Sequence, residues 1–182
     1  MALIHQVAIP AAHGSLEGIL QDGEPGARMS AIVCHPHPLR GGSMHNKVVF
    51  YAAKAFNELG WPVLRFNFRG VGASTGQHAD GVGEQDDARA ALDFLGAERV
   101  VLAGFAFGSL VALNVGPADE RVVALCGIGV PVETRGSELE GVRQSEKPKL
   151  LVQGQLDQFG GPAAMEPWFA AVAEPKRLVW VE

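Results

Sequence analysis

The chain has 182 residues and a formal net charge of −5, with 47% hydrophobic and 19% charged residues. This length and apolar fraction suit one folded domain and exclude a disordered chain. The acidic balance argues against nucleic-acid and membrane partners, and no apolar run approaches the roughly 20 residues of a membrane helix. Without a signal-peptide pattern, and with only Cys34 and Cys126 as thiols, we expect a cytoplasmic location.

Hydrophobic residues recur along the chain at the spacings typical of strands and helices. The first two strands are short and predict an antiparallel hairpin. From residue 29 onwards strands and helices alternate, which predicts parallel strands joined by helical crossovers, with helices on both faces of the sheet. The predicted strands cover residues 7–9, 16–20, 29–34, 62–68, 99–103, 121–127, 149–152 and 177–181, and the predicted helices cover 47–59, 84–95, 107–115 and a segment that begins at Pro162.

Two segments carry many polar residues: the predicted helix over 84–95 and residues 132–147. In the helix over 84–95, an apolar stripe predicts that Glu84, Asp86, Asp87 and Arg89 lie on the solvent side. Acidic residues in a first helical turn are favoured by the helix dipole. Residues 132–147 have no clear periodicity and predict an irregular connection.

Three loops with unusual composition leave the carboxyl ends of predicted strands, where α/β sheets place their chemistry. The first runs over 34–45 and is restrained by Pro36 and Pro38. Proline has no N–H, so the free donors in this loop come from residues such as His37 and Leu39. A rigid loop with outward N–H groups suits an oxyanion hole.

The same loop holds His35, His37 and His45, which raises the question of a metal site. No acidic or cysteine cluster accompanies them, and His-Pro-His cannot place two rings on one helical face. We therefore expect no metal. For His35 and His45 the simpler interpretation is that the imidazoles hydrogen-bond to local backbone.

The second loop is Gly104-Phe105-Ala106-Phe107-Gly108, between a strand and a helix. It has the frame of a nucleophile elbow, G-x-S-x-G, with alanine where serine belongs. An ordinary glycine-rich turn is the alternative. A dinucleotide site is excluded because neither this segment nor 70–76 fits G-x-G-x-x-G, and no Walker lysine follows a glycine-rich turn.

The third loop follows the strand over 149–152 and contains Asp157. A carboxylate here would point over the sheet edge towards the elbow. A turn-forming aspartate that accepts hydrogen bonds from local amides is an equally good interpretation.

Taken together, the segments 35–49, 64–74 and 81–87 resemble a small bacterial branch of the α/β-hydrolases, near the dienelactone hydrolases. The resemblance covers essentially the whole chain. It implies a three-layer α/β-hydrolase fold, with a mostly parallel, twisted sheet of about eight strands and no cap domain. It further implies serine-type hydrolysis of a small carboxylic ester or lactone without a cofactor.

The resemblance assigns roles to individual residues of this chain. Ala106 occupies the nucleophile position and Asp157 matches the acid. The backbone amides of Phe107 and His37 match the oxyanion donors, with Leu39 as a second candidate for the latter. The pocket is expected to be rimmed by Phe105 and Phe159.

Two departures from the family pattern are serious. An alanine methyl cannot attack a carbonyl, and loss of such a nucleophile costs a factor of about 10⁶ in turnover. The family places its catalytic histidine in a loop after the last strand, whereas all six histidines of this chain precede residue 80. We therefore expect negligible turnover from a single core domain, residues 1–182, that lacks the histidine loop and the final helix.

Three explanations stay open. Ala106 could be an engineered trap, or a natural loss that leaves a non-catalytic binding or interaction protein. Alternatively, the chain is part of a longer one. Absence of a closing helix would expose apolar sheet surface, for which a homodimer is the expected consequence.

Overall fold

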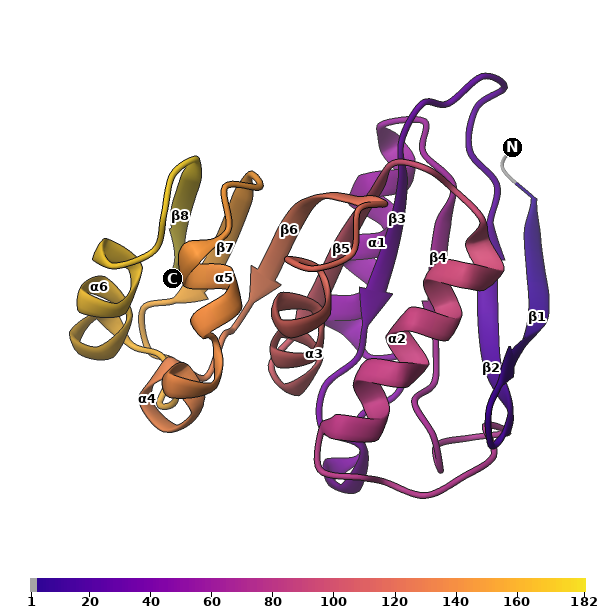
Figure 1. Cartoon of the computed structure of the whole chain (residues 1–182), viewed down its shortest axis with the longest axis horizontal. Helices are drawn as coiled ribbons and strands as arrows, with labels where there is room; N and C mark the ends of the chain where they lie inside the picture. Colours follow the sequence, from indigo (N-terminus) through magenta and orange to yellow (C-terminus); the bar gives the residue numbers. More distant parts are fainter. Residues whose placement is uncertain (1–2) are drawn as a thin grey trace.

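The computed structural model describes residues 3–182, in which eight strands form one sheet (Figure 1). The strands are β1 Ile4–Ala11, β2 Gly14–Gln21, β3 Ser30–Cys34, β4 Val63–Phe66, β5 Val100–Phe105, β6 Val122–Ile128, β7 Lys149–Gly154 and β8 Lys176–Val181. Their order is β1-β2-β4-β3-β5-β6-β7-β8. The β1–β2 and β2–β4 pairings are antiparallel and all the others are parallel, which confirms the predicted entry hairpin and mostly parallel sheet.

Helices follow most of the strands and cover both faces of the sheet, as predicted. The helices are α1 Lys47–Glu58, α2 Val82–Leu95, α3 Phe107–Val115, α4 Val132–Arg135, α5 Glu140–Gln144 and α6 Pro162–Ala170, with 3₁₀ turns η1 Pro38–Arg40 and η2 Gly136–Glu138. In Figure 1, α1 lies behind the sheet, whereas α2 and α3 lie in front of it.

Two apolar layers hold these helices to the sheet. Successive residues of a strand point to opposite faces, so the buried run in β3 serves both layers. Ile32 packs in the layer with Leu92 of α2, and Val33 packs in the layer with Val49 of α1. This double burial explains why β3 reads as an uninterrupted apolar run rather than as an alternating one.

The expectation that Glu84 and Asp87 face solvent is wrong: Glu84 is 0% exposed and Asp87 is 1% exposed. Glu84 accepts hydrogen bonds from the amides of Ala79 and Gly81 at the start of α2. Asp87 is paired with Arg69. Buried carboxylates are tolerated when they are paired in this way, and the partners come from outside the helical stripe.

Residues 132–147 are not the irregular segment that their polarity suggested, because they form α4, η2 and α5. Val132, Leu139 and Val142 are buried and anchor these short helices against the core. Their spacing is too sparse to show as a helical period, which explains why the sequence pattern missed them.

The parallel arrangement brings three loops to one edge of the sheet. β3, β5 and β7 run in the same direction, so the segments that follow them begin at the same edge. These are the three loops singled out by their composition. Among residues 3–182, no helix has the length and apolar character needed to cross a membrane.

Candidate functional site

Ala106 sits at the sharp turn between β5 and α3, with a φ of 50° and a ψ of −115°. A positive φ is unusual for any residue other than glycine, and here it produces the abrupt strand-to-helix reversal of a nucleophile elbow. Gly104 permits the turn, because a Cβ there would lie 2.1 Å from the Gly108 carbonyl oxygen. The backbone therefore has elbow geometry although its central side chain is a methyl group.

Two backbone amides near the elbow are free to bind an oxygen. The Phe107 amide starts α3, where no intrahelical acceptor exists. Within residues 3–182, neither this amide nor that of His37 donates a hydrogen bond. The Leu39 amide, in contrast, donates to Nδ1 of His37 over 3.2 Å. Of the two candidates in the first loop, His37 has the unengaged amide.

Side chains from β4 and the residues after it hold the first loop in place. Arg65 donates to the carbonyl oxygen of Met44 over 2.9 Å, and Asn67 accepts from the amide of Met44 over 2.8 Å. Nε2 of His35 accepts from the amide of Phe68 over 3.0 Å. Arg65, Asn67 and the amide of Phe68 thus fasten the loop that carries His37.

The expectation of hydrogen bonds to local backbone is confirmed for His35 and wrong for His45, whose exposed ring makes no hydrogen bond within residues 3–182. Nδ1 of His35 lies 2.6 Å from the carbonyl oxygen of Pro36, and its Nε2 is engaged as above. Burial lowers the pKa of this imidazole to about 4, so it is neutral at pH 7. Among residues 3–182 no three His, Cys, Asp or Glu side chains are grouped as a metal site.

Asp157 follows β7 and lines the same cavity as Ala106. One carboxylate oxygen accepts from the amide of Phe159 over 2.8 Å, and the other accepts from Nε2 of Gln153 over 3.0 Å. Gln153 is itself buried and accepts from the amide of Val130. The turn-forming interpretation of Asp157 is confirmed by the Phe159 amide, and the carboxylate also lines the cavity that contains Ala106. In the described part of the chain no imidazole contacts Asp157.

The cavity has a volume of about 680 Å³, within the range usual for small-molecule sites. The predicted pocket residues Phe105 and Phe159 line it. So do Arg40, which lies in the first loop but was given no role there, and Arg135, which lies in the 132–147 segment. The full lining is Pro36, His37, Arg40, Phe105, Ala106, Phe107, Leu110, Gly129, Pro131, Thr134, Arg135, Leu156, Asp157, Gln158 and Phe159.

Burial and nearby charges act on the imidazole of His37. Burial lowers the pKa of His37 below its ordinary value, and positive charge on His78, Arg40 and Arg135 lowers it further. The carboxylate of Glu84 acts in the opposite direction. Since Nδ1 of His37 accepts the Leu39 amide proton, a neutral ring carries its own proton on Nε2. His37 is therefore a donor in this state and not a base.

Within residues 3–182, neither Ser109 nor Cys34 is placed to act as a nucleophile beside Ala106. The hydroxyl of Ser109 is buried and donates to the carbonyl oxygen of Ala106 over 2.5 Å. The thiol of Cys34 is fully buried, and burial raises its pKa well above the usual range. Only the thiolate form of cysteine is reactive, so Cys34 is a core residue.

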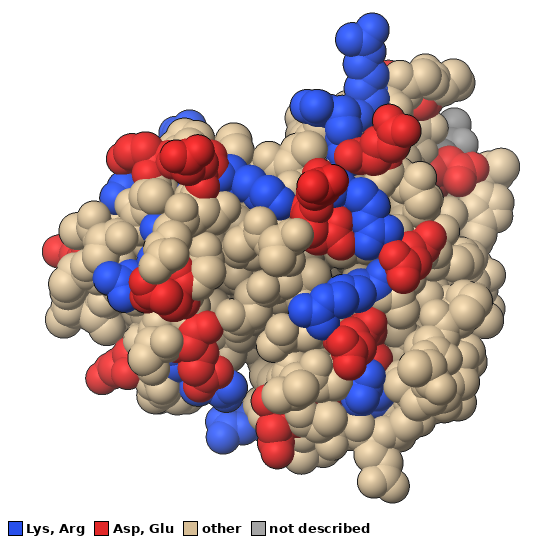
Figure 2. All heavy atoms as spheres, in the orientation of Figure 1, with Lys and Arg blue, Asp and Glu red and all other residues tan. Residues whose placement is uncertain are grey.

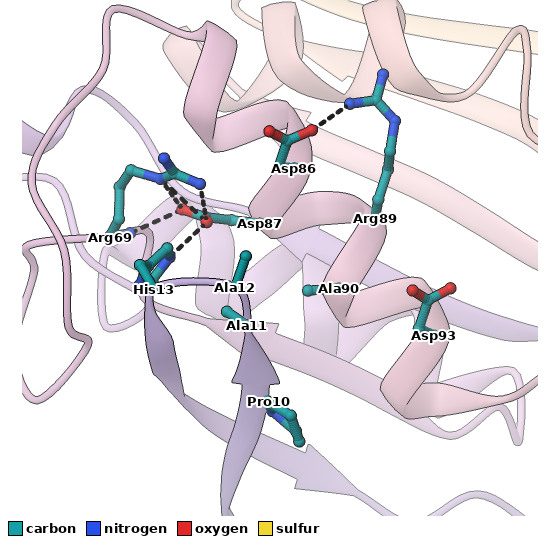
Figure 3. A pocket seen from close by; sticks show the side chains of 10 residues that line it. All are labelled: Pro10, Ala11, Ala12, His13, Arg69, Asp86, Asp87, Arg89, Ala90 and Asp93. Carbon is teal, nitrogen blue, oxygen red and sulfur yellow. Dashed lines mark hydrogen bonds and ion pairs between the residues drawn. The ribbon is translucent and has the colours of Figure 1, made fainter.

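A second hollow lies between the β1–β2 turn and α2, away from the elbow (Figure 3). Its centre is Asp87, whose carboxylate accepts from the guanidinium of Arg69 over 2.7 Å and lies 3.0 Å from Nε2 of His13 (Figure 3). Asp87 also accepts from the amide of Arg69 over 2.9 Å. These contacts join the hairpin, the 69–76 loop and α2, which indicates a structural role. Figure 2 shows that the face with α2 and α3 carries interspersed acidic and basic side chains.

The α/β-hydrolases have a mostly parallel sheet with an elbow after one strand, an acidic residue after a later strand and free amides beside the elbow. This chain has the same arrangement, with the elbow after β5 and Asp157 after β7. The comparisons agree. Residues 31–182 match the model of the "Alpha/beta hydrolase family". The chain therefore belongs to this family.

Individual relatives support the same assignment. An uncharacterized protein of Rickettsia prowazekii is 39% identical over 160 residues, which is 85% of this chain and 67% of that protein. A structure described as an α/β serine hydrolase homologue from Coxiella burnetii superposes with a TM-score of 0.89 at 34% identity, over 97% of this chain and 86% of that one. A lidless α/β serine hydrolase from Xanthomonas campestris superposes with a TM-score of 0.86 at 34% identity, over 98% and 83%.

Proposed function

We propose that the Ala106 cavity binds a small carboxylic ester or lactone, with the carbonyl oxygen on the amides of His37 and Phe107. The reaction class of the site is serine-type ester hydrolysis, and with alanine at position 106 this chain binds such a molecule without hydrolysing it. The observation that carries the proposal is that Ala106 retains the positive φ of an elbow, beside two unengaged amides.

The chemistry follows from what each group would do if position 106 were serine. The hydroxyl oxygen would attack the carbonyl carbon while an imidazole took its proton, and the carbonyl oxygen would become an oxyanion held by the two amides. Asp157 would orient that imidazole. Protonation of the leaving alcohol would give an acyl-enzyme, which water would hydrolyse.

A serine at position 106 would not by itself complete these steps, because no imidazole within residues 3–182 is placed to take its proton. His37 lines the cavity, but its Nδ1 is engaged by the Leu39 amide and its remaining nitrogen is a donor when the ring is neutral. The acid Asp157 contacts Gln153 and a backbone amide. Ester binding therefore tests the proposed function more directly than turnover does.

The size and rim of the cavity support a small or flexible acyl group. Its volume of about 680 Å³ accommodates a short ester. Leu156 and Phe159 line the cavity and are exposed large apolar side chains, which gives its mouth apolar contact surface.

Binding can be measured by NMR on the chain as it stands, because no turnover depletes the ligand. Methyl butyrate is titrated against methyl butyl ether, a molecule of similar size that lacks the carbonyl. We expect the ester to shift the amide resonances of His37 and Phe107 and to bind at least about threefold more tightly. Equal affinity for the ether, or shifts confined to the hollow around His13 and Asp87, would contradict the proposal.

A fluorophosphonate probe tests the absence of turnover. The probe transfers its phosphonyl group to an activated serine oxygen with loss of fluoride. We expect no labelling of the peptide that contains Ala106 and Ser109, because the first has no hydroxyl and the second is buried. Labelling of that peptide would mean that Ser109 serves as a nucleophile, and the proposed inactivity would then be wrong.

A non-catalytic binding or interaction protein is the second candidate. It is favoured by the same two observations that argue against turnover: the methyl group at the elbow and the absence of an imidazole against Asp157 in residues 3–182. The two candidates make the same prediction for ester binding by this chain, and they differ in whether Ala106→Ser, supplied with a histidine opposite Asp157, hydrolyses a short aryl ester.

A further inference from the structure

Three aromatic rings meet beside the elbow. The ring centroids of His37 and Phe107 are 5.0 Å apart, those of His37 and His78 are 5.0 Å apart, and those of His78 and Phe107 are 5.6 Å apart. His37 and Phe107 are the two residues whose backbone amides would hold the carbonyl oxygen. His78, from the loop before α2, contacts the rings of both.

His78 is itself held by a buried carboxylate. Its Nδ1 lies 2.7 Å from Oε1 of Glu84, in an ion-pair contact that lacks the alignment of a hydrogen bond. Its Nε2 lies 3.3 Å from Oδ1 of the exposed Asp80. Glu84 is 0% exposed and is fixed in turn by the amides of Ala79 and Gly81. The ring of His78 is therefore tied to the first turn of α2.

The loop that carries His37 depends on the neutral form of its ring. Nδ1 accepts from the Leu39 amide within the turn that begins η1, and this contact is lost if Nδ1 is protonated. The charged groups that act on this ring are His78, Arg40 and Arg135, which favour the neutral form, and Glu84, which opposes them. Burial and the positive charges of Arg40 and Arg135 thus favour the ring form that the turn requires.

We propose that His78, held by Glu84, is a positioning residue for the oxyanion hole: its ring supports those of His37 and Phe107, and so fixes the two amides that bind the carbonyl oxygen. This role rests on the proposed function, since it assigns a purpose to the same amides. The positioning role also gives a reason for the full burial of the Glu84 carboxylate, which the sequence pattern predicted to be exposed.

Three variants separate the contributions of ring and charge. His78→Phe keeps an aromatic ring and removes both nitrogens, His78→Ala removes the ring, and Glu84→Gln removes the carboxylate charge that holds it. The matched control is His45→Phe, because His45 is an exposed histidine of the first loop with no side-chain hydrogen bond among residues 3–182. The melting temperature of each variant reports on the fold.

The first measurement is the titration of the His37 imidazole by NMR. In His78→Phe we expect its midpoint to rise, because a neighbouring positive charge is lost while Glu84 stays. Ester affinity should consequently fall more at pH 6 than at pH 8 in this variant, relative to the unmodified chain. In His78→Ala and Glu84→Gln we expect methyl butyrate to bind about fivefold more weakly at both pH values.

The outcomes are distinguishable. Ester affinities that stay within experimental error of the unmodified chain in folded His78→Ala, or in folded Glu84→Gln, would overturn the positioning role. So would equal effects in His45→Phe. If His78→Ala fails to fold, His78→Phe and Glu84→Gln carry the test. If the unmodified chain binds no ester, the proposed function fails, while the His37 titration still decides whether His78 acts on His37.

Discussion

Gly108 lies directly against the carbonyl group of Cys34: a Cβ on Gly108 would come within 2.3 Å of the Cys34 oxygen and 2.5 Å of the His35 oxygen. The first turn of α3 therefore touches the backbone at the end of β3, where the first loop begins. This contact places the Phe107 amide and the first loop side by side. It depends on the backbone and not on the residue at position 106, so the elbow frame persists with alanine at its centre.

The close approach predicts a large effect for Gly108→Ala. Backbone atoms cannot move aside as a flexible side chain can, so we expect a loss of about 3 kcal/mol in the free energy of unfolding. Gly141→Ala is the control, because its Cβ would meet nothing nearer than 3.9 Å and it lies in α5. Urea denaturation should show an unchanged or slightly raised stability for the control. Similar values for both variants would mean that the elbow is looser than described.

Ala106→Gly should stabilise the protein. The φ of 50° and ψ of −115° at this position are strained for alanine and accessible to glycine. We expect the free energy of unfolding to rise by about 1 kcal/mol. Ala118→Gly, at an exposed position without positive φ, should instead lose a few tenths of a kcal/mol. A stability loss in Ala106→Gly equal to that of the control would contradict the strain.

The pH dependence of stability should contain a contribution from His35. Burial lowers its pKa to about 4 in the folded protein, whereas the unfolded chain has the ordinary value of about 6.5. Between these values the unfolded chain binds the extra proton, so stability is lost as the pH falls from about 6.5 towards 4, by about 3 kcal/mol at most.

The measurement is urea denaturation of the unmodified chain and of His35→Gln between pH 4 and pH 7. The variant is less stable at pH 7 because the fit around Phe68 is lost, but its stability should vary less with pH. Parallel curves for the two proteins would show that His35 does not titrate in this way.

Asp87→Asn should destabilise the fold without weakening the ester site. The substitution removes the charge that faces Arg69 in a buried position, with an expected cost of about 3 kcal/mol. Asp86→Asn is the control, since Asp86 is exposed and pairs with Arg89 on the surface, a contact worth less than about 1 kcal/mol. Ester affinity, measured below the unfolding transition, should be the same in both. Loss of ester binding in folded Asp87→Asn would contradict this prediction, because it would mean that the Asp87 contacts influence the Ala106 cavity.

Neither cysteine should react in the native protein. Burial raises the pKa of Cys126 to about 12 and that of Cys34 further still. A disulfide-exchange reagent such as Ellman's should release no colour at pH 8 until denaturant is added, and both thiols should then react. Rapid reaction of one thiol before unfolding would show that its surroundings open readily.

Sequence-based predictions were correct where the residues that form a feature lie close together in the chain. The elbow was predicted because Gly104 and Gly108 are required by backbone contact, and glycine spacing reports that directly. The hydrogen bonding of His35 was predicted because both of its ring nitrogens contact backbone groups. The prediction for Glu84 was wrong. An apolar stripe shows which side of a helix faces the core, but it does not show whether a charged residue beside the stripe finds a buried partner.

The sequence by itself determined the strand and helix alternation, the three loops at the carboxyl edge, and the alanine at the nucleophile position. These follow from hydrophobic periodicity and from glycine and proline, which act over a few residues. Only the tertiary structure decided that the ring of His78 packs at a tilt against those of His37 and Phe107, that Asp87 joins Arg69 to His13, and that Arg40 and Arg135 line one cavity. Those contacts join segments far apart in the chain, and no periodic pattern specifies which distant groups come within a few ångströms of one another.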